Sequence, residues 1–292
     1  MALRGIDVSY AQGTINWSAV YADGVRFAII KATQGRAVSS NSYLFADRHF
    51  AANITGASDV GLKVGVYHYL TAKTVKEAQR EAQHFIDTIA PYKPRIELWA
   101  AVDVEEKKYL PKNKKLLTEI VNAFTAYVAA EGYRPMIYTN RDFFQSYLNF
   151  GSLSHKTIWR AHWKSNGYLT YGDVDADSHP TDYAGDMPIW QFGMGKRGTV
   201  KGIGADIDLN YGYFDETAPN VPTVALPDND GFAVGDRVKV RAGRNYLYGT
   251  IKKFALWFRE YEVLSVRGDR VVIGKMGKVT AAVDAENLVR VD

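Results

Sequence analysis

The sequence predicts an α/β protein in which an irregular parallel barrel is followed by a small all-β barrel. Short apolar runs alternate with helical patterns through residues 3–211, which is typical of βα units around a parallel sheet. Acids recur near the ends of these runs, at Asp7, Asp103 and Asp208, as in barrels that work at their strand ends. After residue 230, short alternating runs broken by Gly and Asp predict strands without helices.

The strands and helices of the first part follow one another in nearly regular order. We expect strands at residues 3–7, 27–32, 63–69, 98–103, 135–139, 157–161, 188–192 and 207–211, and helices at 18–23, 43–57, 75–89, 114–131 and 143–149. The helix at 75–89 has the clearest pattern, because its apolar residues recur at helical spacing. The last three strands lack intervening helices, which favours an incomplete barrel over a regular eightfold one.

A change of composition near residue 216 predicts a domain boundary. The polar stretch from Glu216 to Gly231 holds three prolines, which is typical of a linker. We therefore expect a first domain at residues 1–216, a linker at 217–230 and a second domain at 231–292. The second domain has expected strands at 237–241, 246–251, 261–266, 270–273 and 279–283, the pattern of a small SH3-like barrel.

Composition narrows the function. The chain has 292 residues, 47% of them hydrophobic, a net charge of +4 and no cysteine, so thiol catalysis, disulfides and cysteine metal sites are excluded. The six histidines show no metal-binding spacing, and we expect His68 and His162 to be structural. No glycine-rich phosphate loop precedes a helix, so we expect no nucleotide site. Together with the histidine spacing, this predicts neither a cofactor nor a metal.

Two further segments bear on where the protein acts. No apolar run is long enough to span a bilayer, so we expect no membrane insertion. The N-terminus lacks a long apolar segment, which predicts synthesis in the cytoplasm without a signal peptide. A secreted bacterial protein whose signal peptide had been removed would look the same.

Asp103 and Glu105 are the candidate catalytic pair. Their i, i+2 spacing after an apolar run places both carboxyls on one side of a strand, roughly 6–7 Å apart. Such a pair can cleave an acetal, but a solvated acidic loop continuing into Glu106 or a divalent-cation site would look the same. Asp7 and Asp208 favour catalysis, because four acids at one barrel mouth would raise one another's pKa and keep one protonated near neutral pH.

The first part of the chain resembles glycoside hydrolase family 25, the Chalaropsis-type lysozymes, which include many phage endolysins. The resemblance is carried by an ordered set of segments over about the first 215 residues: Gly5-Ile-Asp7-Val-Ser9, Phe27-Ala-Ile-Ile-Lys31-Ala-Thr33, Val64-Gly-Val-Tyr67-His68-Tyr69, Val102-Asp103-Val-Glu105, Ile137-Tyr138-Thr-Asn140, Ile189-Trp190-Gln191-Phe192 and Asp208-Leu-Asn210. It implies a TIM-like (β/α)5β3 barrel and cleavage of the β-1,4 bond from N-acetylmuramic acid to N-acetylglucosamine.

The resemblance also implies roles for single residues. Glu105 would be the general acid, and Asp103 would orient the substrate N-acetyl group or stabilise the developing positive charge. Asp7 and Asp208 would be supporting acids of the catalytic site. The aromatic residues at matching strand ends, Tyr67, Tyr138 and Trp190, would line the sugar groove, although such residues also pack barrel mouths.

One departure from the family pattern and one open point concern the chemistry. Gln34 stands where a glutamate often follows Lys-Ala-Thr in this family, so the mouth has one charge fewer. The expected spacing of the pair lies between the values typical of retaining and inverting enzymes. We favour substrate-assisted cleavage with net retention, in which the 2-acetamido carbonyl attacks the anomeric carbon.

The second domain holds the segments Gly235-Asp-Arg-Val-Lys-Val, Tyr246-Leu-Tyr248-Gly249 and Arg270-Val-Val-Ile-Gly274. Through them it resembles bacterial SH3-type wall-binding domains. Residues 232–292 hold twelve Lys or Arg against seven Asp or Glu, a net charge of +5, which suits an anionic wall. RNA binding and a simple folding partner are the alternatives for this domain. For the whole chain we expect a phage endolysin that binds peptidoglycan and no nucleic acid, with a non-enzymatic wall-binding protein as the alternative; the oligomeric state stays open.

Overall fold

A computed structural model describes residues 2–36, 43–181, 186–215, 232–241, 244, 245, 247, 248, 254–267, 270–276 and 278–291. Contacts between residues divide the chain into two compact units, and the chain passes from the first to the second between residues 215 and 232. The predicted linker at 217–230 lies outside the described residues.

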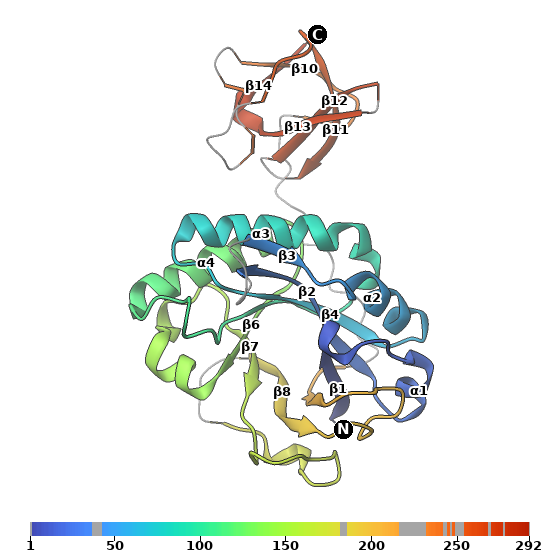
Figure 1. The fold of residues 1–292 in the computed structure, drawn as a ribbon. Coiled ribbons are helices and arrows are strands. Elements are labelled where there is room, and N and C mark those ends of the chain that lie inside the picture. The colour runs from blue at the N-terminus through green and yellow to red at the C-terminus, as the bar shows by residue number, and fades with distance from the viewer. Residues whose placement is uncertain are drawn as a thin grey trace. The chain divides into compact units, whose positions relative to one another are not determined.

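The first unit is a closed barrel (Figure 1). Its strands are β1 (Leu3–Val8), β2 (Phe27–Arg36), β4 (Lys63–Tyr69), β5 (Ala100–Asp103), β6 (Pro135–Asn140), β7 (Thr157–Ala161), β8 (Asp186–Gly195) and β9 (Ile207–Gly212). Neighbours follow the order β1-β9-β8-β7-β6-β5-β4-β2, and pairing of β1 with β2 closes the ring. Strand β9 is antiparallel to both of its neighbours, while the other pairs in the ring are parallel.

The helices occupy the connections expected from βα units. They are α1 (Trp17–Ala22), α2 (Phe50–Asp59), α3 (Val75–Ile89) and α4 (Lys114–Ala130), with a π-helical turn at Phe143–Tyr147 and short 3-10 turns at Tyr10–Gln12, Ala90–Arg95, Phe150–Ser152 and Ala176–Ser178. As predicted, the strands from β7 to β9 have no α-helix between them within the described residues.

The helix predicted at 43–57 was wrong at its start. Residues 43–46 form an extra strand, β3 (Tyr43–Ala46), which pairs antiparallel with the end of β2, and α2 begins only at Phe50. Asp47 separates the two elements, because its carboxylate accepts the backbone N–H of His49 and forms a local turn. Strand pairing therefore overrides the helical periodicity in this segment.

Strict alternation of side chains separates the two cores of the barrel. On β6, Met136 and Tyr138 point into the barrel and join its interior cluster, whereas Ile137 belongs to the cluster shared with the helices. Aromatic rings fill much of the interior and leave no room for a side chain at Gly5, where a Cβ would lie 2.0 Å from the ring of Phe27. The same alternation decides which side chains reach the barrel mouth.

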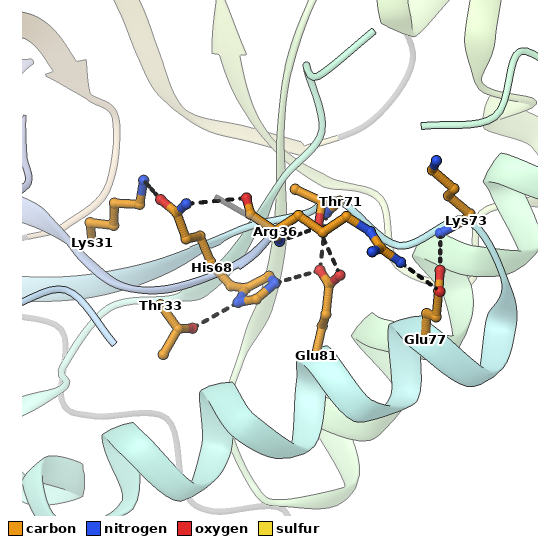
Figure 2. A network of polar contacts seen from close by, with 9 residues as sticks. Lys31, Thr33, Arg36, His68, Thr71, Lys73, Glu77 and Glu81 are labelled. Carbon is orange, nitrogen blue, oxygen red and sulfur yellow. Dashed lines mark hydrogen bonds and ion pairs between the residues drawn. The ribbon is translucent and has the colours of Figure 1, made fainter. Parts of the chain in front are cut away.

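A buried polar network ties α3 to the sheet on the outer side of β4 (Figure 2). Glu81 of α3 accepts hydrogen bonds from His68 Nε2 at 2.8 Å and from the backbone N–H and hydroxyl of Thr71. Burial lowers the pKa of His68, so the ring is neutral and its Nδ1 accepts from the Thr33 hydroxyl at 2.7 Å. His68 is thus structural, as the sequence predicts.

The second unit is an antiparallel sheet. Its strands are β10 (Arg237–Val240), β11 (Tyr261–Arg267), β12 (Arg270–Lys275), β13 (Lys278–Asp284) and β14 (Leu288–Arg290), in the order β13-β12-β11-β10-β14, with a 3-10 turn at Ala285–Asn287. Four predicted strands are confirmed, β14 was not expected, and the strand predicted at 246–251 lies mostly outside the described residues.

Candidate active site

Four acidic residues meet at one mouth of the barrel. Asp7 stands near the end of β1, directly opposite Asp208 at the start of antiparallel β9. Asp103 is the last residue of β5, and Glu105 follows two residues later. The Val104 N–H donates to the Tyr138 carbonyl at 2.9 Å and prolongs the β5–β6 ladder, so Glu105 leaves on the same side as Asp103.

Burial raises the pKa of every carboxyl in this set, and neighbouring charges raise three of them further, at Asp103, Glu105 and Asp208. Asp7 and Asp103 are only 7% and 6% exposed. Burial is the largest cause for all four acids, and it raises the pKa of Asp7 to about 6 and that of Asp208 to about 8. The pKa of Asp103 is raised further by the charge of Glu105, and the pKa of Glu105 by the charge of Asp7. The mouth can therefore hold protons at neutral pH.

Amide side chains hold Asp7 in place. Its Oδ2 accepts hydrogen bonds from Gln191 Nε2 at 3.0 Å and from Asn210 Nδ2 at 2.7 Å. Asn210 in turn accepts from the indole N–H of Trp159 inside the barrel. Both bonds favour the charged form of Asp7 and partly offset the effect of burial on its pKa.

Asp103 differs from Asp7 because its Oδ1 is buried without a hydrogen-bond partner among the described residues. The positive charge of Lys31 on β2 lowers the pKa of both Asp103 and Glu105. Burial lowers the pKa of Lys31 itself, and its ammonium donates to Gln34 Oε1 at 2.8 Å. The departure at Gln34 therefore pairs the lysine with a neutral acceptor.

A cavity of about 420 Å³ opens beside Glu105. Its lining includes Tyr138, Asn140, Arg141, His162, Trp163 and Asn166. Trp163 is 40% exposed, and its indole N–H donates to Gln191 Oε1 at 2.9 Å, which fixes the ring in the cavity wall. An apolar ring face beside hydrogen-bonding groups is suited to binding a sugar.

The three aromatic residues predicted to line the groove have different positions. Tyr138 lines the cavity, and Tyr67 packs edge-on against Trp159 with ring centroids 5.9 Å apart. Trp190 does not reach the site: it is 0% exposed and packs against Phe192 in the outer core. The reason is the alternation on β8, which turns its neighbour Gln191 inward and Trp190 outward.

Several site residues were missed by reasoning from the sequence. Gln191, Asn210, Lys31 and Trp163 were not assigned roles, and His162 lines the cavity although it was expected to be only structural. A period-two count from Asp208 would have found Asn210, because both must share one face of β9. No comparable signal marks Trp163, which follows the end of β7.

The described residues hold neither a candidate metal site nor a candidate membrane-spanning helix. They contain no group of three or more His, Asp or Glu arranged to hold a metal ion. None of their helices is both long enough and apolar enough to cross a bilayer.

Comparison with known proteins gives consistent results. The chain is 29% identical to the "Autolytic lysozyme" of Clostridium acetobutylicum over 209 residues, which are 71% of this chain and 55% of that protein. It is 30% identical to the "N,O-diacetylmuramidase" of Arthroderma benhamiae over 208 residues, covering 66% of this chain and 84% of that protein. The chain thus spans about half the length of the Clostridium protein.

The fold and a family model agree with these relatives. The bacterial lysozyme of Streptomyces coelicolor superimposes with a TM-score of 0.53 at 25% identity, covering 78% of this chain and 98% of that one. The model of the glycosyl hydrolases family 25 matches residues 6–203, which hold the whole acidic site except Asp208. The chain belongs to glycosyl hydrolase family 25.

Proposed function

We propose that the first unit is an N-acetylmuramidase that cleaves the β-1,4 bond between N-acetylmuramic acid and N-acetylglucosamine in bacterial peptidoglycan. The observation that carries the proposal is the convergence of four acids with raised pKa values beside a cavity that Glu105 lines. The relatives named as lysozyme and muramidase support the substrate class.

The proposed reaction divides the work between two carboxyls. Glu105, whose pKa is raised, donates its proton to the glycosidic oxygen as the bond to the anomeric carbon breaks. The unpaired Oδ1 of Asp103 accepts the N–H of the 2-acetamido group and directs its carbonyl oxygen at the anomeric carbon. This attack closes a five-membered oxazoline ring. Water then opens that ring at the anomeric carbon and returns a proton to Glu105, with net retention of configuration. Inversion seen by NMR during cleavage would exclude this route.

The catalytic proposal is tested by product analysis. Wild-type protein digests purified peptidoglycan, and mass spectrometry identifies the new reducing ends as muramic acid. Glu105→Gln is expected to lower turnover by about 10²–10⁴-fold, because an amide cannot donate the proton. Glu119→Gln, an exposed change on α4, is the matched control and keeps wild-type turnover. Near-normal turnover in Glu105→Gln would refute the role, and glucosamine ends or free amines would refute the muramidase.

For the second unit, residues 231–292, we propose an SH3-like module that binds the wall, joined to the catalytic domain (1–216) by a linker (217–230). Its net positive charge supports this, as does an exposed aromatic tip where Trp257 is 77% exposed between Leu256 and Phe258. The buried Tyr261 hydroxyl accepts the backbone N–H groups of Trp257 and Phe258, so the tip is held in shape. Exposed rings of this kind stack on sugars and, in the rival function, on RNA bases.

Sedimentation of the full chain with purified walls tests the module. Trp257→Ala is expected to lower the wall-bound fraction severalfold while hydrolysis of short soluble glycans stays unchanged. Met276→Ala, at another exposed apolar position of this unit, is the control and sediments like wild type. Unchanged sedimentation of Trp257→Ala would exclude the tip as the contact, and tight RNA binding without wall binding would reverse the assignment.

We also propose that the protein acts as a phage endolysin, made in the host cytoplasm and released at lysis. Host cells that express it should stay intact until their membrane is permeabilised, and should then lyse within minutes. Lysis without permeabilisation would contradict this localisation.

A further inference from the structure

The Tyr138 hydroxyl stands between two acceptors. It donates to Gln191 Oε1 at 2.9 Å, with both groups buried. Glu105 lines the same cavity as Tyr138, and hydrogen bonding to this hydroxyl lowers the pKa of the Glu105 carboxyl. A phenol carries a single proton, so it can donate to only one of these acceptors at a time.

Gln191 can lose the hydrogen bond from Tyr138 at little energetic cost. Its Oε1 also accepts from the Trp163 indole N–H at 2.9 Å, and its Nε2 donates to Asp7 at 3.0 Å. If the Tyr138 hydroxyl turns away, the Gln191 oxygen therefore keeps a donor, and no buried polar atom is left unpaired. The Gln191 oxygen thus has a hydrogen-bond donor whether or not the Tyr138 hydroxyl points to it.

We propose that Tyr138 is a positioning residue whose hydroxyl turns between Gln191 and Glu105 during the reaction. The inference rests on the proposed role of Glu105 as general acid. While Glu105 is protonated, the Tyr138 proton points to Gln191. Once Glu105 is a carboxylate, the hydroxyl points to it and stabilises the new charge.

The proton count is conserved in each step. The Glu105 proton moves to the leaving oxygen as the C–O bond breaks, and the Tyr138 hydroxyl rotates without giving up its own proton. When water attacks, its proton returns to Glu105, and the hydroxyl turns back to Gln191. Tyr138 stays a phenol throughout, consistent with a pKa raised well above its usual value by burial and by the charge of Glu105.

Other charged groups face Glu105 and must stay constant in any test. They are Asp7 on β1, Lys31 on β2, Asp103 on β5, Asp208 on β9, the adjacent Glu106, and, in the lining of the same cavity, Arg141, Asp142 and His162. Substitutions at Tyr138 and Gln191 leave all of them in place. Shifts in the Glu105 pKa can then be assigned to the hydroxyl or to Asp7, which Gln191 also contacts.

The test compares two variants with opposite expected signs. Tyr138→Phe removes the donor to the Glu105 carboxylate, so the alkaline limb of kcat/KM should rise by about one pH unit and kcat should fall about tenfold. Gln191→Met removes the competing acceptor, so the Tyr138 hydroxyl keeps donating to Glu105. The alkaline limb of kcat/KM should therefore move to lower pH. In the Tyr138→Phe background, Gln191→Met should lose this effect, because it acts through the hydroxyl.

Each outcome supports or overturns the proposal. A uniform loss of activity without a limb shift in Tyr138→Phe, shifts of equal sign, or a Gln191→Met effect that persists in the double variant would overturn it. Tyr211→Phe, which removes a buried hydroxyl bonded to the carbonyls of Tyr171 and Val174, is the control and leaves the limb in place. Carboxyl-carbon NMR titration of Glu105 in the same variants gives the pKa shifts without activity, so failure of muramidase activity would not obscure the result.

Discussion

Substitution of Asp7 by Asn should stabilise the first unit, and by an amount that grows with pH. Both amide donors converge on one oxygen of Asp7, Oδ2, so an asparagine that places its Oδ1 there keeps both hydrogen bonds. The substitution therefore removes the titratable charge with little change in geometry.

The magnitude follows from the pKa of Asp7, which burial raises from 3.8 to about 6. Between these values the folded state keeps the proton and the unfolded state has lost it, so wild-type stability falls as the pH rises. Well below pH 4 both states are protonated, and well above pH 6 both are ionised and the cost is constant. A shift of this size corresponds to about 3 kcal/mol, of which Asp7→Asn should recover nearly all at pH 7 and less than about 0.5 kcal/mol at pH 3.5.

Urea unfolding at pH 3.5, 5 and 7, followed by tryptophan fluorescence, measures this difference. Five of the six tryptophans lie in the first unit, so the signal reports its unfolding. Asp177→Asn, at an exposed position of the 3-10 turn Ala176–Ser178, is the control and should show no growing difference. A gap between Asp7→Asn and wild type that stays constant from pH 3.5 to 7 would refute the reasoning.

Two further substitutions test the surroundings of the site. Gln34→Glu places a carboxylate beside the ammonium of Lys31 and cancels the influence of that charge on Glu105. The alkaline limb of kcat/KM should therefore rise by a few tenths of a pH unit. An unchanged or lowered limb would contradict the role of Lys31. Gly5→Ala forces a methyl group into the ring of Phe27 and should lower the urea-unfolding free energy by about 1–3 kcal/mol, whereas wild-type stability would show that the barrel interior can yield.

The barrel strands and the acids at their ends could be predicted from the sequence because both depend on local pattern. Apolar runs and period-two alternation identify a strand and the side it turns inward, so the i, i+2 spacing alone places Asp103 and Glu105 on one face. The family resemblance added the role expected of each residue in the reaction. Local pattern failed at residues 43–46, where an available edge of β2 outweighed helical spacing.

The composition of the site depended on tertiary structure. Trp190 was assigned to the groove and lies in the outer core, while Gln191, one residue later, donates a hydrogen bond to Asp7 from two strands away. Alternation within one strand says that two neighbours face opposite sides, but the pairing of β8 with β9 and of β9 with β1 decides which atoms meet. The raised pKa values share this origin, because only folding buries these carboxyls and brings the charge of Asp7 close to Asp208, near the other end of the barrel sequence.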